Sequence, residues 1–253
     1  MKPFILSETN WKTIKDQKID MAVLPWGATE AHNYHLPFAT DNIMVEKIAA
    51  ESAEIAWNSG ARAIILPIIP FGVNTGQLDI KLDINLNPST QFAILNDVAD
   101  VLNRHKIYKF LILNGHGGND FKQMIRELGP KYPEMFICSC NWYQSFANSE
   151  FFENGGGHAD EMETSVMQFL APELILPLNE AGKGIGKKFR IKALNENWVW
   201  AERTWSEVTV DTGIGNPQKA TPAKGEKCLK EVINKIGNLM IDLCGADINN
   251  MYE

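Results

Sequence analysis

Four of the five histidines in the chain fall in three short polar segments that also carry carboxylates. The first segment, residues 26–41, holds Glu30, His32, His35 and Asp41. The second, residues 114–119, presents His116, and the third, residues 155–163, holds His158, Asp160, Glu161 and Glu163. Imidazole and carboxylate together suit borderline divalent cations such as zinc or manganese, and no thiol lies nearby to indicate a structural cysteine site. The pattern therefore predicts a catalytic metal site.

Each of these residues also has an ordinary structural interpretation. Asp41 stands where it could cap a helix, and Asp160 and Glu161 fall in a first helical turn, where acidic residues favour the helix dipole. Any single histidine is more often a polar loop residue or a satisfied interior one. His116 could belong to a phosphate-cradling loop, but its segment lacks the spacing of a P-loop or a Gly-x-Gly-x-x-Gly motif. All these explanations would have to coincide, so a metal site is favoured.

Short apolar runs alternate with segments of helical periodicity over the first two thirds of the chain. Strands are predicted at residues 20–25, 61–67, 108–113 and 135–140, and helices at 42–57, 90–104, 119–128 and 159–170. This alternation predicts an α/β fold whose parallel sheet has helices on both faces. Ligands of such sheets collect outside the carboxyl ends of the strands, where the polar segments would meet.

The last third of the chain has a weaker pattern. The basic stretch 183–192 is interpreted as a solvated loop or edge, and Trp, Val and Thr favour strands or a hairpin over 198–210. A final helix is predicted at 221–243. No internal repeat or linker divides the sequence, so one domain is expected over residues 1–253.

Charge and composition exclude several classes of partner. The formal net charge is −7, and nucleic-acid binding relies on clustered Lys and Arg, so no nucleic-acid partner is expected. No apolar run reaches the length of a membrane span, and the N-terminus lacks the features of a signal peptide. The four cysteines form no disulfide or zinc-ribbon spacing and are predicted to be free. A cytoplasmic protein without a membrane partner is expected.

Three ordered motifs resemble those of the creatininase (creatinine amidohydrolase) family. They lie at residues 25–37 with Asp41, at 113–119 and at 158–165, and residues 213–221 resemble the family's Gly-x-Gly-x-Pro segment. The resemblance runs from about residue 20 to residue 225. It implies a three-layer α/β/α sandwich with a mostly parallel sheet, and two divalent metal ions, zinc and/or manganese. It also implies a small-molecule substrate and a homo-oligomer, often a hexamer.

The resemblance further implies a role for individual residues. The matching metal ligands are Glu30, His32, Asp41 and His116, with Asp41 bridging the two ions. Glu163 is the expected fifth ligand, and His158 matches the catalytic histidine, a general acid/base for the leaving nitrogen, with a metal-bound hydroxide as nucleophile. The implied reaction is hydrolysis of a cyclic amide or amidine carbon–nitrogen bond. A formamide hydrolase acting on a purine-derived intermediate, a peptidase that trims a modified peptide, and a metal-binding homologue without turnover remain alternatives.

Departures from the family pattern bear on the metal site and on the substrate. Creatininases carry a carboxylate two residues after the histidine that matches His116, whereas this chain has Gly118. Glu163 is expected to take over that role, or one metal site is expected to be weak. The segment 154–157 reads Asn-Gly-Gly-Gly where creatininases place an aromatic residue, so creatinine itself is not the expected substrate. The sequence identifies no substrate-binding residue.

Overall fold

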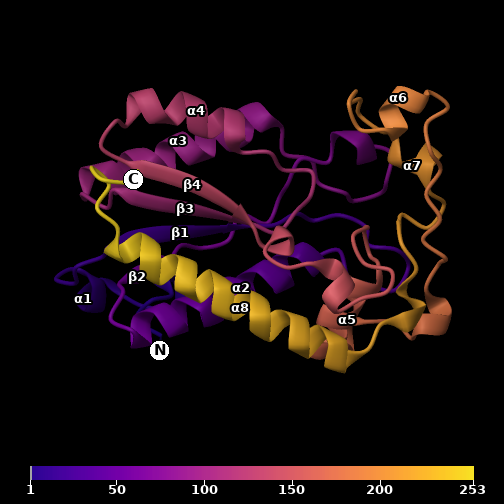
Figure 1. Cartoon of the computed structure of the whole chain (residues 1–253), viewed down its shortest axis with the longest axis horizontal. Coiled ribbons are helices and arrows are strands. Elements are labelled where there is room, and N and C mark those ends of the chain that lie inside the picture. The colour runs from indigo at the N-terminus through magenta and orange to yellow at the C-terminus, as the bar shows by residue number, and fades with distance from the viewer. Residues whose placement is uncertain (1) are drawn as a thin grey trace.

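The computed structural model describes residues 2–253. Its centre is a four-stranded parallel sheet built from β1 (Met21–Trp26), β2 (Ala63–Ile65), β3 (Lys109–Asn114) and β4 (Phe136–Asn141). The strand order is β2-β1-β3-β4, so the chain moves to one side of β1 and then returns to its other side (Figure 1). The predicted α/β fold is confirmed. The strand order reverses between the neighbouring strands β1 and β3, which makes their carboxyl ends a topological switch point. Open parallel sheets bind ligands at such a point.

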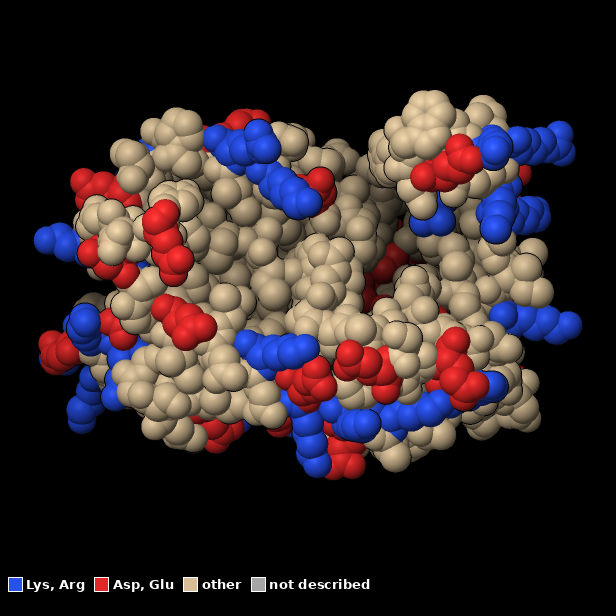
Figure 2. Space-filling model, viewed as in Figure 1, with Lys and Arg blue, Asp and Glu red and all other residues tan. Residues whose placement is uncertain are grey.

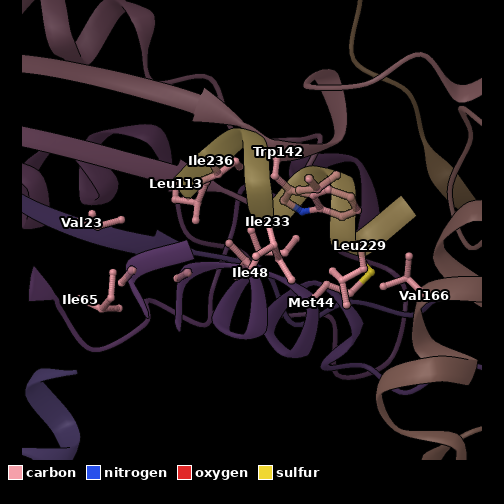
Figure 3. Close-up of a cluster of buried hydrophobic side chains, with 14 of the residues drawn as sticks. Val23, Met44, Ile48, Ile65, Leu113, Trp142, Val166, Leu229, Ile233 and Ile236 are labelled. Carbon is pink, nitrogen blue, oxygen red and sulfur yellow. The ribbon is translucent and has the colours of Figure 1, made fainter. Parts of the chain in front are cut away.

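Alternate side chains of the central strands pack on opposite faces of the sheet. On one face, Met21 and Val23 join a core formed with α2 (Thr40–Asn58), α5 (Glu161–Leu170) and α8 (Pro222–Gly245), part of which Figure 3 shows around Ile48 and Ile233. On the other face, Leu24 joins a core formed with α3 (Pro88–Arg104) and α4 (Lys122–Lys131). Both faces of β1 are buried, which explains why its sequence is a continuous apolar run rather than an alternating one.

Helix α8 is held close to α5, and α5 begins at the third polar segment. Thr221 caps α8 by accepting a hydrogen bond from the Lys224 amide, and Pro222 occupies the first turn. At Gly225 a Cβ atom would lie 2.0 Å from the carbonyl oxygen of Ser165, so only glycine permits this approach of the two backbones. The long C-terminal helix therefore fixes α5 against the sheet.

The segment between α5 and α8 contains short helices and irregular backbone instead of the strands predicted at 198–210. Its α-helices are α6 (Lys192–Asn195) and α7 (Trp205–Val208). Thr209 Oγ1 donates to Asp211 and contacts the Gly213 carbonyl oxygen, and the Trp205 indole donates to the Thr212 carbonyl oxygen. This segment is thus held by turns and side-chain hydrogen bonds, and it contains no strand. The prediction of strands was wrong because residue types alone favoured them.

The remaining short elements complete the described chain. They are α1 (Trp11–Ile14) and the 3-10 turns η1 (Leu6–Glu8), η2 (Thr75–Gln77), η3 (Trp142–Gln144), η4 (Asn148–Glu150), η5 (Pro172–Leu174), η6 (Leu178–Glu180) and η7 (Pro217–Lys219). Among residues 2–253, no helix is long and apolar enough to cross a membrane. The four cysteines are free, as predicted.

Candidate metal centre

The three polar segments meet at the carboxyl ends of β1 and β3, beside the first turn of α2. Two glycines permit this approach. A Cβ atom on Gly27 would lie 2.1 Å from Asn42 Oδ1, and one on Gly115 would lie 2.9 Å from the Cβ of Val45. The ends of both strands can therefore approach the turn that carries Asp41.

Glu30, Asp41 and His116 form one group of potential ligands. His116 Nδ1 lies 2.8 Å from Glu30 Oε1 and 3.1 Å from Asp41 Oδ2. All three side chains are buried, and one ligand atom of each lies within 4.8 Å of the others. Buried carboxylates and imidazole in mutual contact form a donor set typical of a divalent cation site.

A second group consists of His32, Asp41 and Glu163. His32 Nε2 lies 3.3 Å from Asp41 Oδ1 and 3.9 Å from Glu163 Oε2, and these side chains are also buried. Asp41 belongs to both groups and offers a different oxygen to each histidine. Each of the two histidines thus faces its own oxygen of the Asp41 carboxylate.

Asp41 does not cap α2, although the sequence allowed that interpretation. The N-cap residue is Ala39, without a side-chain hydrogen bond, and Asp41 lies within the first turn of the helix. Its position favours the helix dipole, but its carboxylate faces His32 and His116. The first turn of α2 thus supplies a side chain to the candidate centre.

Gly118 leaves no room for the carboxylate that creatininases carry at this position. A Cβ atom there would lie 2.4 Å from both His116 Nε2 and the Val73 carbonyl oxygen, two atoms that are hydrogen-bonded at 3.0 Å. Glu163 instead brings its carboxylate to the group with His32 and Asp41. That Glu163 takes over the role of the missing carboxylate stays a prediction.

His158 lies at the edge of the same cluster. Its Nδ1 atom is 3.9 Å from Glu30 Oε1, and its ring centroid is 4.2 Å from that of His32. Its backbone forms two hydrogen bonds with Ile214, in the segment that resembled the family's Gly-x-Gly-x-Pro stretch. That segment therefore supports the histidine from a distant part of the sequence.

The histidines His32, His116 and His158 each have one ring nitrogen next to a backbone carbonyl and the other facing the cluster. His32 Nδ1 lies 3.0 Å from the Glu30 carbonyl oxygen, His116 Nε2 lies 3.0 Å from that of Val73, and His158 Nε2 lies 2.9 Å from that of Ala31. Metal-ligating histidines are commonly oriented by such donation of their second N–H group.

Protonation in the cluster follows from burial and close opposite charges. Burial alone would lower the pKa of His32, but the charge and hydrogen bond of Asp41 and the charge of Glu163 raise it to about 10. Burial also opposes protonation of His116, yet Glu30 and Asp41 hold its pKa well above the usual range. Burial raises the pKa of Glu163 to about 8. Protons thus neutralise part of the buried negative charge that cations would otherwise offset.

Glu30 and His158 shift in the opposite direction. Burial would raise the pKa of Glu30, but the positive charge and the hydrogen bond of His116 hold it well below its usual range. Burial and the charge of His32 lower the pKa of His158. His158 is therefore neutral near pH 7, as a general base must be.

Three other polar residues of these segments have structural partners. Asp160 is the N-cap of α5 and accepts hydrogen bonds from the Met162 and Glu163 amides. Glu161 is buried and pairs with Lys224 at 2.5 Å. His35 Nε2 lies 2.9 Å from Thr164 Oγ1. Asp160 thus caps the helix instead of lying in its first turn, Glu161 lies in that turn, and none of the potential ligand groups includes Asp160, Glu161 or His35.

Sequence reasoning missed two residues that contact this cluster. Gln77 donates a hydrogen bond from Nε2 to Glu30 Oε2, while Glu30 Oε1 faces the histidines. Trp205 packs edge-on against His158, with ring centroids 5.5 Å apart. Gln77 lies in a loop without a motif, and Trp205 lies where strands were predicted. No sequence signal connected either residue with the polar segments.

A cavity of about 780 Å³ opens above the cluster. Figure 2 shows a hollow between the body of the molecule and the region that carries α6 and α7, with acidic side chains visible at its floor. Glu30, Asp41, His116, His158 and Glu163 all line the cavity. These five side chains thus border the space that a bound molecule would enter, whereas His32 lies beneath it.

Comparison with known proteins places this chain in a family. The model of the family "Creatininase: Creatinine amidohydrolase" matches residues 7–240. A protein of Bacteroides fragilis NCTC 9343 that carries a provisional creatinine amidohydrolase name is 43% identical, with a TM-score of 0.93 and full coverage of both chains.

Two more distant similarities are also found. A creatininase variant complexed with creatine is 19% identical, with a TM-score of 0.79 over 97% of this chain and 100% of its own. The mycofactocin precursor peptide peptidase of Mycolicibacterium smegmatis is 22% identical over 85% of this chain and 82% of its own length. The match of the family model over most of the sequence shows that this chain belongs to the creatininase family of hydrolases.

Proposed function

We propose that this chain is a metal-dependent amidohydrolase that cleaves a non-peptide carbon–nitrogen bond of a cyclic amide or amidine. One observation carries the proposal: two buried ligand groups share Asp41 at the floor of a cavity that His158 also lines. Two divalent ions, zinc and/or manganese, would be held by Glu30, Asp41 and His116 on one side and by His32, Asp41 and Glu163 on the other. When bound, such ions lower the pKa of water and polarise a carbonyl group.

The donor set fits divalent cations on electrostatic grounds. Three carboxylates, Glu30, Asp41 and Glu163, are buried within one cluster, and burying like charges together is unfavourable unless cations offset them. The hydrogen bond from Gln77 occupies Glu30 Oε2 and leaves Oε1 directed at the cluster.

His158 is placed to move the proton of the reaction. With its Nε2 next to the Ala31 carbonyl oxygen, Nδ1 is the nitrogen that faces the cluster. A neutral His158 accepts a proton from the attacking water at Nδ1 and delivers it to the leaving nitrogen. The contact with Trp205 limits rotation of the ring, so the accepting atom stays directed at the cavity.

The size of the cavity supports a second candidate, a formamide hydrolase acting on a larger molecule. Pockets for drug-sized ligands occupy about 300–1,000 Å³, and 780 Å³ lies well within that range. The same residues would act, with formate as the released acid. A coupled assay for formate distinguishes this candidate from ring opening.

Metal content per chain tests the proposal. Protein purified without chelator should contain close to two divalent ions, and Glu30→Gln and Glu163→Gln should each lose metal because each removes one carboxylate ligand. Glu173→Gln, an exposed glutamate outside the cavity, is the matched control. Metal-loaded protein is then assayed with cyclic amides and formamides, with His158→Ala expected to abolish turnover. A parent protein without metal would contradict the ligand assignment, and metal without any turnover would favour a binding homologue.

A further inference from the structure

One cationic side chain stands at the wall of an otherwise acidic cavity. Besides the candidate ligands, Asp120 and Glu202 line it, and among the described residues that line it Arg203 is the only Lys or Arg. Its guanidinium lies over the ring of Trp205, 4.7 Å from the centroid. No carboxylate in the described part of the chain forms an ion pair with it.

The neighbouring carboxylate of Glu202 is engaged elsewhere. Its Oε2 accepts a hydrogen bond from Thr75 Oγ1 at 2.8 Å, and its Oε1 accepts one from the backbone amide of Arg203 at 3.1 Å. Glu202 therefore holds the backbone of this segment and leaves the guanidinium without a partner. The N–H groups of Arg203 remain available to a bound molecule.

The segment around Arg203 is attached firmly to the body of the protein. A Cβ atom on Gly76 would lie 2.2 Å from the Arg203 carbonyl oxygen, so the backbones of η2 and this segment are in direct contact. Ser206 donates to Asp79, and the Trp205 indole donates to the Thr212 carbonyl oxygen at 2.8 Å. Trp205 is buried and lies between Arg203 and His158. The guanidinium thus rests on a rigid aromatic ring that also touches the proposed acid/base.

We propose that Arg203 binds an anionic group, a carboxylate or phosphate, on a substrate whose reacting carbon–nitrogen bond lies at His158. The inference rests on the proposed function and adds a substrate class to it. Guanidinium groups bind carboxylate and phosphate in a bidentate manner, and stacking on an aromatic ring orients them for this. Trp205 separates the two ends by one ring, with centroid distances of 5.5 Å to His158 and 4.7 Å to Arg203. The anion is therefore expected at the end of a spacer, distant from the reacting bond.

Matched probes test the proposal on the zinc-loaded full chain. N-formyl-glycylglycine carries a formamide and a carboxylate, separated by a spacer of about 7 Å when extended. Its C-terminal amide differs only in lacking the charge, and N-formyl-2-aminoethyl phosphate supplies the other anion. Dissociation constants are measured by calorimetry, and the ratio of kcat/KM replaces their ratio if formate is released. We expect the carboxylate to bind about three- to tenfold more tightly than the amide.

Three variants assign that preference to one side chain. In Arg203→Gln the preference should disappear, and in Arg203→Lys part of it should remain. Arg190→Gln, with the same change of charge at an exposed position outside the cavity, should keep all of it. If the phosphate probe binds more tightly than the carboxylate and loses this advantage in Arg203→Gln, phosphate is the anion. If it binds no more tightly, carboxylate is.

Some outcomes overturn the proposal. These are equal binding of the carboxylate and the amide, no measurable binding of any probe, or a preference that survives in Arg203→Gln. Metal content is measured on every sample. A parent protein that lacks metal contradicts the proposed function itself, whereas a metal-loaded parent without the charge preference contradicts only the role of Arg203.

Discussion

The floor of the cavity and the wall opposite it are built in different ways. The floor consists of side chains at the ends of β1 and β3 and at the first turns of α2 and α5, all attached to the buried sheet. The opposite wall comes from irregular backbone around α7 and carries Arg203 and Trp205. The floor holds the groups that bind ions and move protons, which need fixed positions. The wall holds groups suited to recognising a substrate, and loops vary more easily than the elements that they connect.

The largest effect should come from the residue shared by the two ligand groups. Asp41→Asn replaces one carboxylate oxygen with an amide nitrogen and removes the negative charge, so one group loses a ligand and the other keeps only a neutral carbonyl oxygen. The metal content should therefore fall close to zero. Asp120→Asn, which lines the same cavity but belongs to neither group, is the control. Atomic emission on both variants measures the difference. Full metal retention in Asp41→Asn would show that Asp41 is not a ligand shared by the two groups.

The pH dependence of metal binding should be the next largest effect. Because the pKa values of Glu163, about 8, and His32, about 10, are raised in the metal-free protein, both carry protons at pH 7 that a bound ion must displace. His116, also raised, adds a third proton. Affinity should therefore rise with pH, by about tenfold per unit for each proton released. The slope should become shallower above pH 8, once Glu163 has ionised.

Proton release can be counted directly. Calorimetric titration of zinc in buffers with different enthalpies of ionisation gives the number of protons released per ion. The same titration on Glu163→Gln should release fewer protons below pH 8, because that variant has no carboxyl group to ionise at this position. An affinity that is flat between pH 6 and pH 8 would contradict the protonation states described for the floor.

Gln77 connects the floor with the wall, and its substitution should have an intermediate effect on metal binding. It donates to Glu30, and its turn η2 also contacts the Glu202–Arg203 segment. Gln77→Leu should weaken metal binding about 10- to 100-fold, because an unsupported Glu30 is less well oriented. Gln91→Leu is the matched control, since Gln91 is also buried but donates to Asn119. Equal metal affinity in the two variants would exclude a specific role for Gln77.

The smallest effect on metal content should come from a substitution in the irregular wall. Trp205→Ala removes the ring that packs against His158 and supports Arg203, so turnover should fall several-fold while metal content stays unchanged. Trp198→Ala, at an exposed position outside the cavity, should change neither quantity. Loss of metal in Trp205→Ala would mean that this wall also supports the metal-binding floor.

Much of the floor could be predicted from the sequence because its signals are local. The apolar runs identified the four strands, and the position of loops after parallel strands indicated where polar residues would meet. The grouping of His32, Asp41 and His116 followed from that rule. Their spacing along the chain did not reveal that two oxygens of Asp41 face two different histidines, because this depends on how α2 lies against β1 and β3.

The sequence by itself determined the parallel α/β class, the three segments that meet and the family to which they belong. Tertiary structure alone decided that Glu163 reaches the group with His32 while Gly118 has no space for a side chain, since both depend on the packing of α5 and of the Val73 loop. It also decided that Gln77 and Trp205 contact the cluster from segments without a motif. The physical reason is that periodicity reports which face of an element is buried, whereas a contact between irregular segments depends on the path of the whole chain.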